Sequence, residues 1–140
     1  MRVSETMTRE PHVIAPETTL MDTANIMAAN SVGLLPISDG ERIIGMVTDR
    51  DIAVRGVASG KGPDTQVRDV MTGDVKYCYA DQNIDEVARN MSDLQLQRLV
   101  VISRDKRLVG ILSLSDIAKA DSDGRIAGSV LREIAEHAEA

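Results

Sequence analysis

Apolar residues recur with a helical spacing in two segments of the chain, and each segment is followed by two shorter apolar runs. Residues 19–30 (TLMDTANIMAAN) carry apolar side chains at Leu20, Ala24 and Met27. A similar spacing recurs from Ile84 to Met91. Such spacing predicts amphipathic helices. The shorter runs, separated by polar turns, predict strand pairs. They occupy residues 34–37 with 42–47, and 98–102 with 107–112.

Each strand pair is followed by a second predicted helix, beginning at TDRDIAVRGVA (48–58) and at SLSDIAKA (113–120). The first strand pair contains Pro36. Because proline cannot donate to a strand ladder, we expect an edge position or a bulge there.

The last twenty residues predict one more amphipathic helix, with Ser122 or Asp123 as its N-cap. We expect this helix to pack on its own module or on a second copy of the chain. Its expected apolar face consists of Ile126, Val130, Leu131 and Ile134.

The chain contains an internal duplication. A shift of 64 places VSETMT (3–8) on VRDVMT (67–72) and Leu20 on Ile84. With one extra residue in the second copy, a shift of 65 places LLPISDGERIIG (34–45) on LVVISRDKRLVG (99–110). Over residues 34–53 eight of twenty pairs are identical, where chance would give roughly one or two. Each copy therefore represents one supersecondary unit.

One such unit alone could bury only a thin core. The predicted fold class is therefore α/β, with two pseudo-symmetric β-α-β-β-α repeats packed sheet to sheet and a C-terminal helix. We assign the repeats to residues 1–60 and 67–120, a linker to 61–66 and the C-terminal helix to 121–140. The GKG at 60–62 follows a helix and lacks a Ser or Thr after its lysine, which favours a flexible linker over a phosphate-binding loop.

Composition argues against several classes of function. The 140 residues include no Trp, no Phe and two Tyr, so a platform for stacking nucleic-acid bases is not expected. A net charge of -6 and a pI near 4.9 oppose binding to nucleic acid or an anionic membrane. No apolar run approaches the roughly 18 residues of a spanning helix, and we expect a cytoplasmic protein.

The chain offers few groups for catalysis. Its single cysteine, Cys78, excludes an intrachain disulfide and a Cys-rich zinc cluster. We find no nucleophile with an adjacent base and no metal cluster. The prediction is a protein without catalytic residues, metal or required cofactor.

The most conspicuous repeated motif reads GMVTDRDIA at 45–53 and GILSLSDIA at 110–118. A hydroxyl residue three positions before an acid at a helix start is typical of a capping box. The same geometry also suits a phosphoribose. Free amides at a helix N-terminus bind phosphate, and a carboxylate can accept from both ribose hydroxyls. Both interpretations stay open, since a cap can double as an anion site.

The doubled pattern, hydrophobic-x-x-G-h-h-[ST]-x-x-D-h with V-x-x-x-M-T before each copy, resembles a tandem pair of cystathionine-β-synthase (CBS) domains, the Bateman module. The resemblance covers residues 1–120. It implies a regulatory module that binds AMP, ADP, ATP, NAD or S-adenosylmethionine in clefts between the repeats. It also implies a homodimer, with an effector protein in trans as a further candidate partner.

The resemblance assigns roles residue by residue. Asp51 and Asp116 match the ribose-binding acids, and Thr48 and Ser113 match hydroxyls that contact phosphate or ribose. GILSLSDIAKA is similar to the equivalent stretch in the nucleotide-sensing subunit of AMP-activated protein kinase, which adds Ser115 as a phosphate contact.

Two arginines and the start of each repeat complete the implied site. Arg98 lies where the family often places a basic phosphate ligand, and the shift of 65 makes Gly33 its counterpart. Arg50, whose counterpart is Ser115, could compensate, so we expect two non-equivalent sites. Strand residues near the start of each repeat would seat adenine. These are Val13 and Ile14 in the first repeat and Tyr77 in the second.

The leading hypothesis is a non-catalytic regulatory module that binds an adenine nucleotide and signals by rearrangement of its repeats or of a dimer. The alternative is a ligand-free structural or stress-associated dimer in which the Thr/Ser-x-x-Asp motifs are only helix caps. The sequence leaves open which adenine ligand binds, whether one or both sites fill, and which effector responds.

Overall fold

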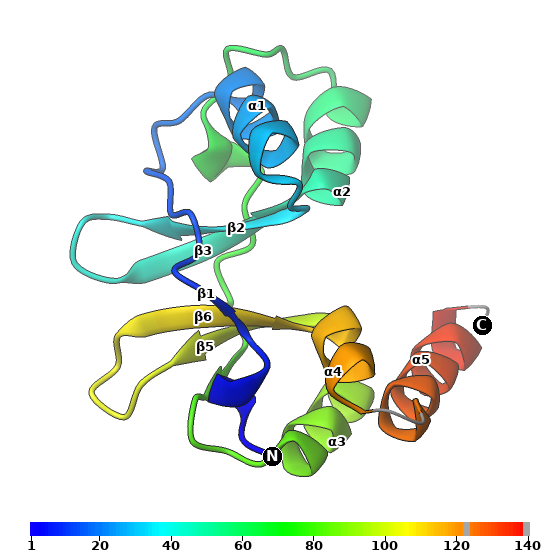
Figure 1. Ribbon diagram of the computed structural model, residues 1–140. Coiled ribbons are helices and arrows are strands. Elements are labelled where there is room, and N and C mark those ends of the chain that lie inside the picture. Colours follow the sequence, from blue (N-terminus) through cyan, green and yellow to red (C-terminus); the bar gives the residue numbers. More distant parts are fainter. Residues whose placement is uncertain (122–123, 139–140) are drawn as a thin grey trace. The chain divides into compact units, whose positions relative to one another are not determined.

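The structure is a computed structural model that describes residues 1–121 and 124–138 (Figure 1). The chain forms two compact units. We call His12–Val75 the N unit, and Met1–Pro11 together with Lys76–Ala140 the C unit. The first eleven residues, which begin the first sequence repeat, therefore pack with the second repeat.

The C unit is a four-stranded sheet with its helices packed on one face. The strand order is β1-β6-β5-β4, with β4 parallel to β5 and the other pairs antiparallel. Its elements are the 3-10 helix η1 (Val3–Glu5), β1 (Thr8–Arg9), β4 (Tyr77–Tyr79), α3 (Ile84–Leu94), β5 (Arg98–Ile102), β6 (Leu108–Ser113), α4 (Leu114–Ala120) and α5 (Arg125–Ala138).

The N unit has the same plan with shorter outer strands. Strands β2 and β3 pair antiparallel, and single bridges flank them at Ile14↔Ile37 (parallel) and Met46↔Thr72 (antiparallel). Its elements are α1 (Leu20–Asn30), β2 (Leu34–Ser38), β3 (Ile43–Thr48), α2 (Asp49–Asp51), the π-helix η2 (Ile52–Gly56), and the 3-10 helices η3 (Val57–Ser59) and η4 (Val67–Asp69).

The predicted mixed α/β fold with a C-terminal helix is confirmed, and so are the helix and strand pair at the centre of each repeat. The predicted helix at 48–58 is less regular than expected, since only three α-helical residues precede the π and 3-10 turns. Buried Gly56 ends the π turn. A Cβ added there would lie 3.0 Å from Leu20 Cδ1, so this turn passes close to α1.

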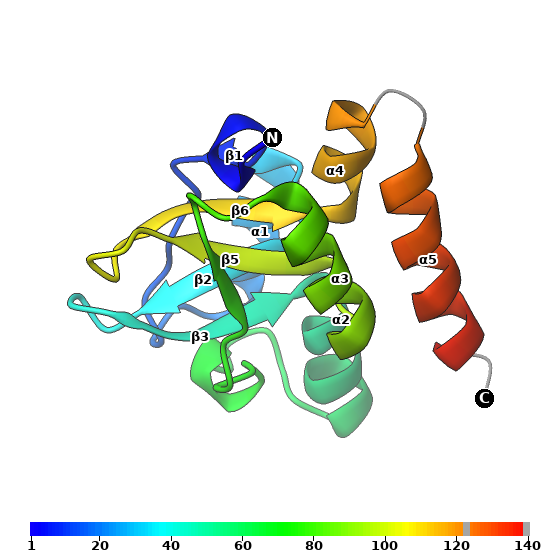
Figure 2. The same ribbon diagram turned by 90° about the horizontal axis from the view of Figure 1, so that it is seen from below.

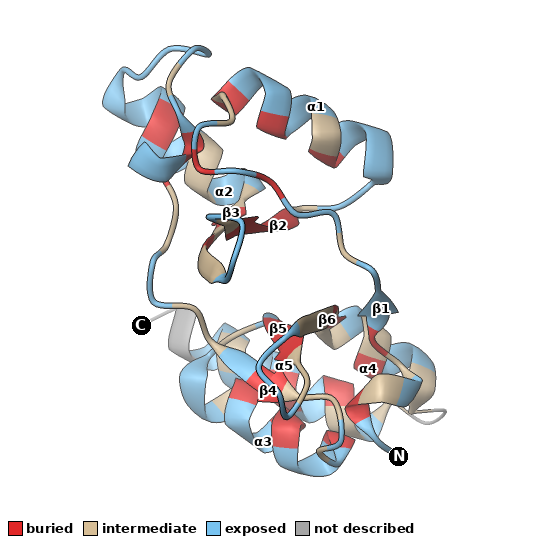
Figure 3. Ribbon diagram, turned by 90° about the vertical axis from the view of Figure 1, so that its left-hand side faces the viewer, coloured by how far each residue is buried: buried red, intermediate tan, exposed pale blue. Residues whose placement is uncertain are grey.

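Each unit has its own core, and the buried positions gather where helices face the sheet (Figure 3). In the C unit, Leu99, Val101 and Leu112 of the sheet pack with residues of α3, α4 and α5. In the N unit, Leu35, Ile37 and Val47 play the same part beneath α1. Aliphatic side chains fill both cores, in keeping with the absence of Phe and Trp from the sequence.

Pro36 lies in β2, which pairs with β3 on one side and bridges to Ile14 on the other, so it is not in the expected edge position. Its carbonyl oxygen accepts from the Ile14 amide at 3.1 Å. The nitrogen and carbonyl of a strand residue point to the same side, so the nitrogen of Pro36 faces away from β3 and the β2–β3 ladder loses no donor. A register shift follows directly, between Ile37 and Ser38.

The strand registers correct the repeat alignment. Thr48 pairs with Leu34, whereas its counterpart Ser113 pairs with Arg98. Residues of β2 therefore correspond to residues of β5 that are 64 positions later. The extra residue of the second repeat lies in its hairpin loop, which spans 103–107, whereas the loop of the first repeat spans 39–42. The counterpart of Arg98 is Leu34, so the assignment to Gly33 was wrong.

Close contacts explain the glycine of the repeated motif. A Cβ added at Gly110 would lie 2.6 Å from Met7 Sδ and 2.7 Å from the Thr8 carbonyl oxygen. At Gly45 the corresponding distances to Met71 Sδ and Thr72 O are 2.7 and 3.0 Å. The V-x-x-x-M-T segment that begins each repeat thus crosses the motif glycine of the other repeat.

The C-terminal helix α5 packs on its own module, beside α3 and α4 (Figure 2). Val130 is buried, and Ile126 and Ile134 pack against the core, as predicted. Leu131, by contrast, is 51% exposed and does not belong to the buried face. The predicted N-cap at 122 or 123 lies outside the described residues.

The segment assigned as a linker is held against the start of α1. The Leu20 amide donates to the Thr65 carbonyl at 2.9 Å, and the Met21 amide donates to the Pro63 carbonyl at 3.1 Å. These hydrogen bonds satisfy two of the amides that an α-helix leaves free at its N-terminus. The segment therefore has a structural role at the start of α1 and is not simply a flexible connection.

Candidate functional site

Both repeated motifs form complete capping boxes. The Asp51 amide donates to Thr48 Oγ1 at 3.1 Å, and the Thr48 amide donates to Asp51 Oδ2 at 2.9 Å. In the C unit the Asp116 amide donates to Ser113 Oγ at 3.1 Å, and the Ser113 amide donates to Asp116 Oδ2 at 2.9 Å. The capping interpretation is therefore confirmed, and the two halves agree in detail.

Most of the helix-start amides that were expected to be free for phosphate already have partners. The Asp49 amide donates to the Gly33 carbonyl, and the Arg50 amide donates to Asp49 Oδ1. The Leu114 amide likewise donates to the Gln97 carbonyl at 2.8 Å. The loop before β2 thus contacts the start of α2, and the loop before β5 contacts the start of α4. A phosphate would therefore have to be bound chiefly by side chains.

Each motif aspartate retains one oxygen for a ligand. The box uses only Oδ2, and for Asp51 and Asp116 the other oxygen has no hydrogen-bond partner within residues 1–121 and 124–138. An ionised carboxylate can accept about four hydrogen bonds, so the cap and a ribose contact are compatible. Thr6 Oγ1 also donates to the Asp116 carbonyl at 2.9 Å, which ties the N-terminal segment to this turn.

In the C unit the strand register brings three predicted site residues onto one sheet face. Arg98 lies directly opposite Ser113, and Tyr77 lies opposite Val100, two residues further along β5. Cross-strand neighbours and alternate residues of one strand project to the same side. This side is the one away from the helix-packed residue Leu99. Arg98 and Tyr77 are both exposed.

The N unit offers a different set at the matching positions. Val13, Leu34 and Thr48 replace Tyr77, Arg98 and Ser113, as the registers show. Arg50 is exposed, as is its counterpart Ser115. Among the described residues, neither the Arg50 nor the Arg98 guanidinium has a hydrogen-bond or ion-pair partner. The unpaired arginine at the predicted site of each unit, Arg50 or Arg98, thus occupies a non-equivalent position.

Ile14 differs from its predicted role. Its side chain is only 6% exposed and belongs to the N-unit core. Its amide donates to the Pro36 carbonyl, and its carbonyl accepts from the Ser38 amide. Neighbouring Val13 is 38% exposed, and by strand alternation its backbone groups point away from β2. Val13, not Ile14, is therefore the residue that a ligand can reach.

A cluster around the two tyrosines was not foreseen from the sequence. The Tyr77 and Tyr79 rings meet edge to face, with centroids 5.7 Å apart and planes at 85°. Lys106 Nζ donates to Tyr79 Oη at 3.0 Å, and the Arg104 guanidinium lies 4.0 Å from the Tyr79 ring centroid. Arg104 is in turn bound by both carboxylate oxygens of Asp81.

The charges of this cluster shift the pKa of its members. The hydrogen bond from Lys106 lowers the pKa of Tyr79, and the same bond raises the pKa of Lys106. The hydrogen bonds from Arg104 lower the pKa of Asp81. One sequence signal could have suggested the cluster, since tyrosines at 77 and 79 project to the same side of a strand next to the basic stretch 104–107.

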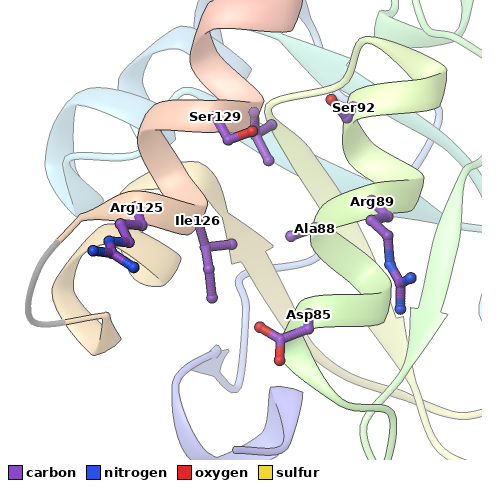
Figure 4. A pocket seen from close by; sticks show the side chains of 8 residues that line it. Asp85, Ala88, Arg89, Ser92, Arg125, Ile126 and Ser129 are labelled. Carbon is purple, nitrogen blue, oxygen red and sulfur yellow. The ribbon is translucent and has the colours of Figure 1, made fainter.

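Two surface pockets are lined by residues outside the capping boxes. One, of about 330 Å³, lies between α3 and α5, where Ala88 and Ile126 line its wall near Ser92 and Ser129 (Figure 4). It contains none of the predicted site residues. The other, of about 430 Å³, lies in the N unit between residues 13–17 and 38–40, and Val13 is part of its lining.

The part of the chain that the structure describes offers neither a metal cluster nor a membrane span. No group of three or more His, Cys, Asp or Glu side chains able to hold a metal ion occurs among the described residues. Within the same residues, no helix is both long enough and apolar enough to cross a bilayer.

The module is a tandem repeat, because its sheet and its capping boxes occur twice and the V-x-x-x-M-T segment of each repeat packs on the other repeat. Comparison with known proteins identifies its class. The sequence profile of the CBS domain matches residues 3–56 and 67–123, so the chain belongs to the CBS domain family. CBS domain-containing protein YhcV of Bacillus subtilis is 32% identical over 132 residues, which is 94% of each chain. Hypoxic response protein 1 of Mycobacterium tuberculosis is 40% identical over 103 residues, which is 72% of this chain and 71% of the other.

Solved structures confirm the fold and show what some related proteins bind. The CBS domain protein TA0289 of Thermoplasma acidophilum matches with a TM-score of 0.84 at 27% identity, over 95% of this chain and 75% of the other. The MJ0100 CBS domain pair, solved with 5'-methylthioadenosine and S-adenosyl-L-methionine, has a TM-score of 0.77 at 25% identity, with 86% and 94% covered. CBSX2 was solved with AMP, and Hypoxic Response Protein I with two coordinated zinc ions. Their TM-scores are 0.71 and 0.75, their identities 26% and 34%, and the match covers 85% of this chain with 94% and 98% of theirs.

Proposed function

We propose that the chain is a non-catalytic regulatory module that binds an adenosine-containing ligand, of the AMP, ADP, ATP or NAD class. In this proposal Asp51 and Asp116 accept from ribose hydroxyls, and Thr48, Ser113 and Ser115 line the site. Arg50 and Arg98 provide the positive charge for phosphate. The module, or a homodimer of it, has two arrangements, and the ligand favours the arrangement that it binds more tightly. An effector protein detects the change of arrangement.

The observation that carries the proposal is the state of the two motif turns. Each capping box leaves one carboxylate oxygen unused, and each unit adds an exposed, unpaired arginine. A helix cap alone requires neither feature. The adenosine-type ligands seen in MJ0100 and CBSX2 support the same class of ligand for this chain.

The test is to titrate AMP, ADP, ATP, NAD and S-adenosylmethionine calorimetrically into wild-type protein and into Asp116→Asn and Asp51→Asn. Asparagine can still accept from the Ser113 or Thr48 amide, so the cap survives while the charge and one acceptor oxygen are lost. Hydrogen bonds to charged groups contribute about 1.5 to 3 kcal/mol. We therefore expect binding to weaken about tenfold to a hundredfold, with little change in melting temperature.

The matched controls remove an exposed carboxylate from each unit without touching a motif turn. Asp93→Asn on α3 and Asp64→Asn in the segment before η4 serve this purpose, since both side chains are exposed. If the controls weaken binding as much as the motif variants do, then net charge rather than the proposed sites governs affinity.

The complete capping boxes also support the alternative, a ligand-free structural dimer. On that view Asp116→Ala and Asp51→Ala cost about 0.5 to 2 kcal/mol of stability each, and no adenine compound raises the melting temperature. A ligand at a thousand times its Kd would add about 4 kcal/mol. Thermal stabilisation by any of the five compounds therefore separates the two functions.

A further inference from the structure

The C-terminal helix α5 adds a pocket to the C unit that the CBS repeats alone do not enclose. The match to the CBS domain ends at residue 123, whereas α5 spans Arg125–Ala138. The pocket of about 330 Å³ between α3 and α5 therefore has one wall outside the part of the chain that matches the family. Small-molecule sites usually have volumes of about 300 to 1,000 Å³, so this pocket is large enough for a small ligand.

A smaller pocket continues the space between the helices. Its volume is about 180 Å³, and it shares Asp85 and Ile126 with the larger pocket. Its other walls include Met1 and two buried residues, Ile84 at the start of α3 and Ile117 of α4. Because the two pockets share wall residues, they form one groove, which we call the α3–α5 groove.

Aliphatic side chains cover the middle of the α3–α5 groove. Ala88 of α3 and Val130 of α5 are buried in the C-unit core, and half-buried Ile126 packs against that core. All three residues line the larger pocket. A hydrocarbon chain gains free energy when it leaves water for such a surface, so the middle of the groove suits an aliphatic ligand.

Two serine hydroxyls lie at one end of this aliphatic surface. Ser92 and Ser129 are on the facing sides of α3 and α5 (Figure 4). A serine within a helix can donate to the carbonyl four residues before it. Among residues 1–121 and 124–138, however, neither of these hydroxyls has a hydrogen-bond partner. Both are therefore available to a polar group in the groove.

A carboxylate lies at the other end. The exposed Asp85 side chain points toward Ile126 (Figure 4), and it has no hydrogen-bond or ion-pair partner in the described part of the chain. Arg89 and Arg125 also line the larger pocket, but their side chains extend away from the space between the helices (Figure 4). In the smaller pocket, Asp121 accepts from the Ile126 amide at 2.8 Å. The charged group directed into the groove is thus an acid, which favours a cationic ligand.

We propose that the α3–α5 groove binds a short aliphatic amine with a second polar group at its far end, such as a diamine or an amino alcohol. The ammonium donates to Asp85, the carbon chain lies on the aliphatic middle, and the second polar group meets the two serines. Asp85 and Ser92 are two helical turns apart, about 10 Å along α3. The net charge of -6 adds a general attraction for cations.

This site is independent of the proposed nucleotide sites, since the groove contains none of their residues. The test follows the backbone amide signals of the full chain by NMR, because an exposed ion pair supports only weak binding. Cadaverine, a linear diamine, is the probe. It should shift the amide signals of Ala88, Ser92, Ser129 and Val130, and the shifts should saturate.

Two further probes separate the contribution of the charge from that of the carbon chain. Pentylamine keeps the ammonium and the chain but lacks the second polar group, so it should bind more weakly than cadaverine. Pentanol has the same chain without the charge. An exposed ion pair corresponds to a difference of up to about fivefold in affinity, so pentanol should bind about fivefold more weakly than pentylamine.

Three variants test the assignment of the groove. Asp85→Asn should weaken the binding of cadaverine and pentylamine about fivefold and leave that of pentanol unchanged. Asp93→Asn is the matched control, since Asp93 is an exposed acid of α3 that does not line the groove. It should change none of the affinities. Ser129→Leu fills the groove from an exposed position and should abolish the binding of all three probes without lowering the melting temperature.

Several results would overturn the proposal. If cadaverine causes no saturable shifts in α3 and α5, the groove is not a binding site. If Asp93→Asn weakens binding as much as Asp85→Asn does, the acidic surface as a whole attracts the amine. If pentanol binds as tightly as pentylamine, the groove does not select a cation. AMP is titrated in parallel, and its affinity should be the same for wild type and Asp85→Asn, so a failure here leaves the proposed function standing.

Discussion

Replacing Gly110 by alanine tests the close crossing between the N-terminal segment and β6. The added Cβ would lie 2.7 Å from a backbone oxygen, Thr8 O, and 2.6 Å from Met7 Sδ. The sulfur can move with its side chain, but the carbonyl can move only with β1. That strand consists of two residues, paired as Thr8↔Ile111 and Arg9↔Gly110, so a displacement disturbs the whole pairing.

The magnitude follows from two opposing terms. Inserting a methyl group into a packed position costs about 1 to 3 kcal/mol. Replacing a glycine by alanine also lowers the conformational entropy of the unfolded chain, which raises the free energy of unfolding by about 0.4 to 1 kcal/mol. We therefore expect Gly110→Ala to lower the free energy of unfolding by about 1 to 2 kcal/mol. Gly45→Ala should cost less, because the backbone oxygen there is 3.0 Å away and the nearer atom is a mobile sulfur.

Urea unfolding followed by tyrosine fluorescence is the appropriate assay, since both tyrosines lie in β4 of the C unit. Gly128→Ala is the matched control. Gly128 lies in helix α5, and a Cβ there would meet nothing within 4 Å. A helix-interior glycine costs about 0.8 to 1 kcal/mol relative to alanine, so this variant should be stabilised. Equal unfolding midpoints for the Gly110 and Gly128 variants would refute the crossing argument.

Two further predictions follow from the same structure. Burial raises the pKa of the Cys78 thiol to about 12. At pH 8 the thiol should therefore react with a disulfide reagent only as fast as the C unit opens, and reaction of folded protein at the rate of a free thiol would contradict this. A chain that begins at His12 lacks buried Val3 and Met7. Full burial of such side chains contributes about 1.5 to 3 kcal/mol each. The unfolding midpoint followed by tyrosine fluorescence should therefore move to a much lower urea concentration. An unchanged midpoint would show that residues 1–11 do not belong to the C unit.

The sequence by itself determined the repeated unit and its chemistry at the motif turns. Apolar periodicity gave the central helix and strand pair of each half, because burial of one face imposes that period locally. The Thr48–Asp51 and Ser113–Asp116 spacing gave the capping boxes, since a hydroxyl and an acid three residues apart meet across one helical turn. Pro36 likewise indicated an irregular position in its strand, and a register shift follows it between Ile37 and Ser38.

Register and long-range packing were decided only by the tertiary structure. The sequence alignment with the most identities places the extra residue before β5, whereas the strand registers place it in the hairpin that follows β5. A loop can accept an extra residue, but an extra residue within a strand would turn its core residues to the other face. That difference changes the counterpart of Arg98 from Gly33 to Leu34. Ile14 shows the same limit, since only the bridge to Ile37 reveals which side of its strand faces the core.

Two further features could not be predicted from the sequence. They are the packing of each V-x-x-x-M-T segment on the other repeat and the tyrosine cluster. Met7 approaches Gly110 across more than a hundred positions, and no local pattern encodes which sheet a two-residue strand will join. Arg104 and Lys106 meet Tyr79 because a hairpin folds beside β4. Local propensity and periodicity fix elements and caps, whereas contacts between distant segments depend on the packing of the whole unit.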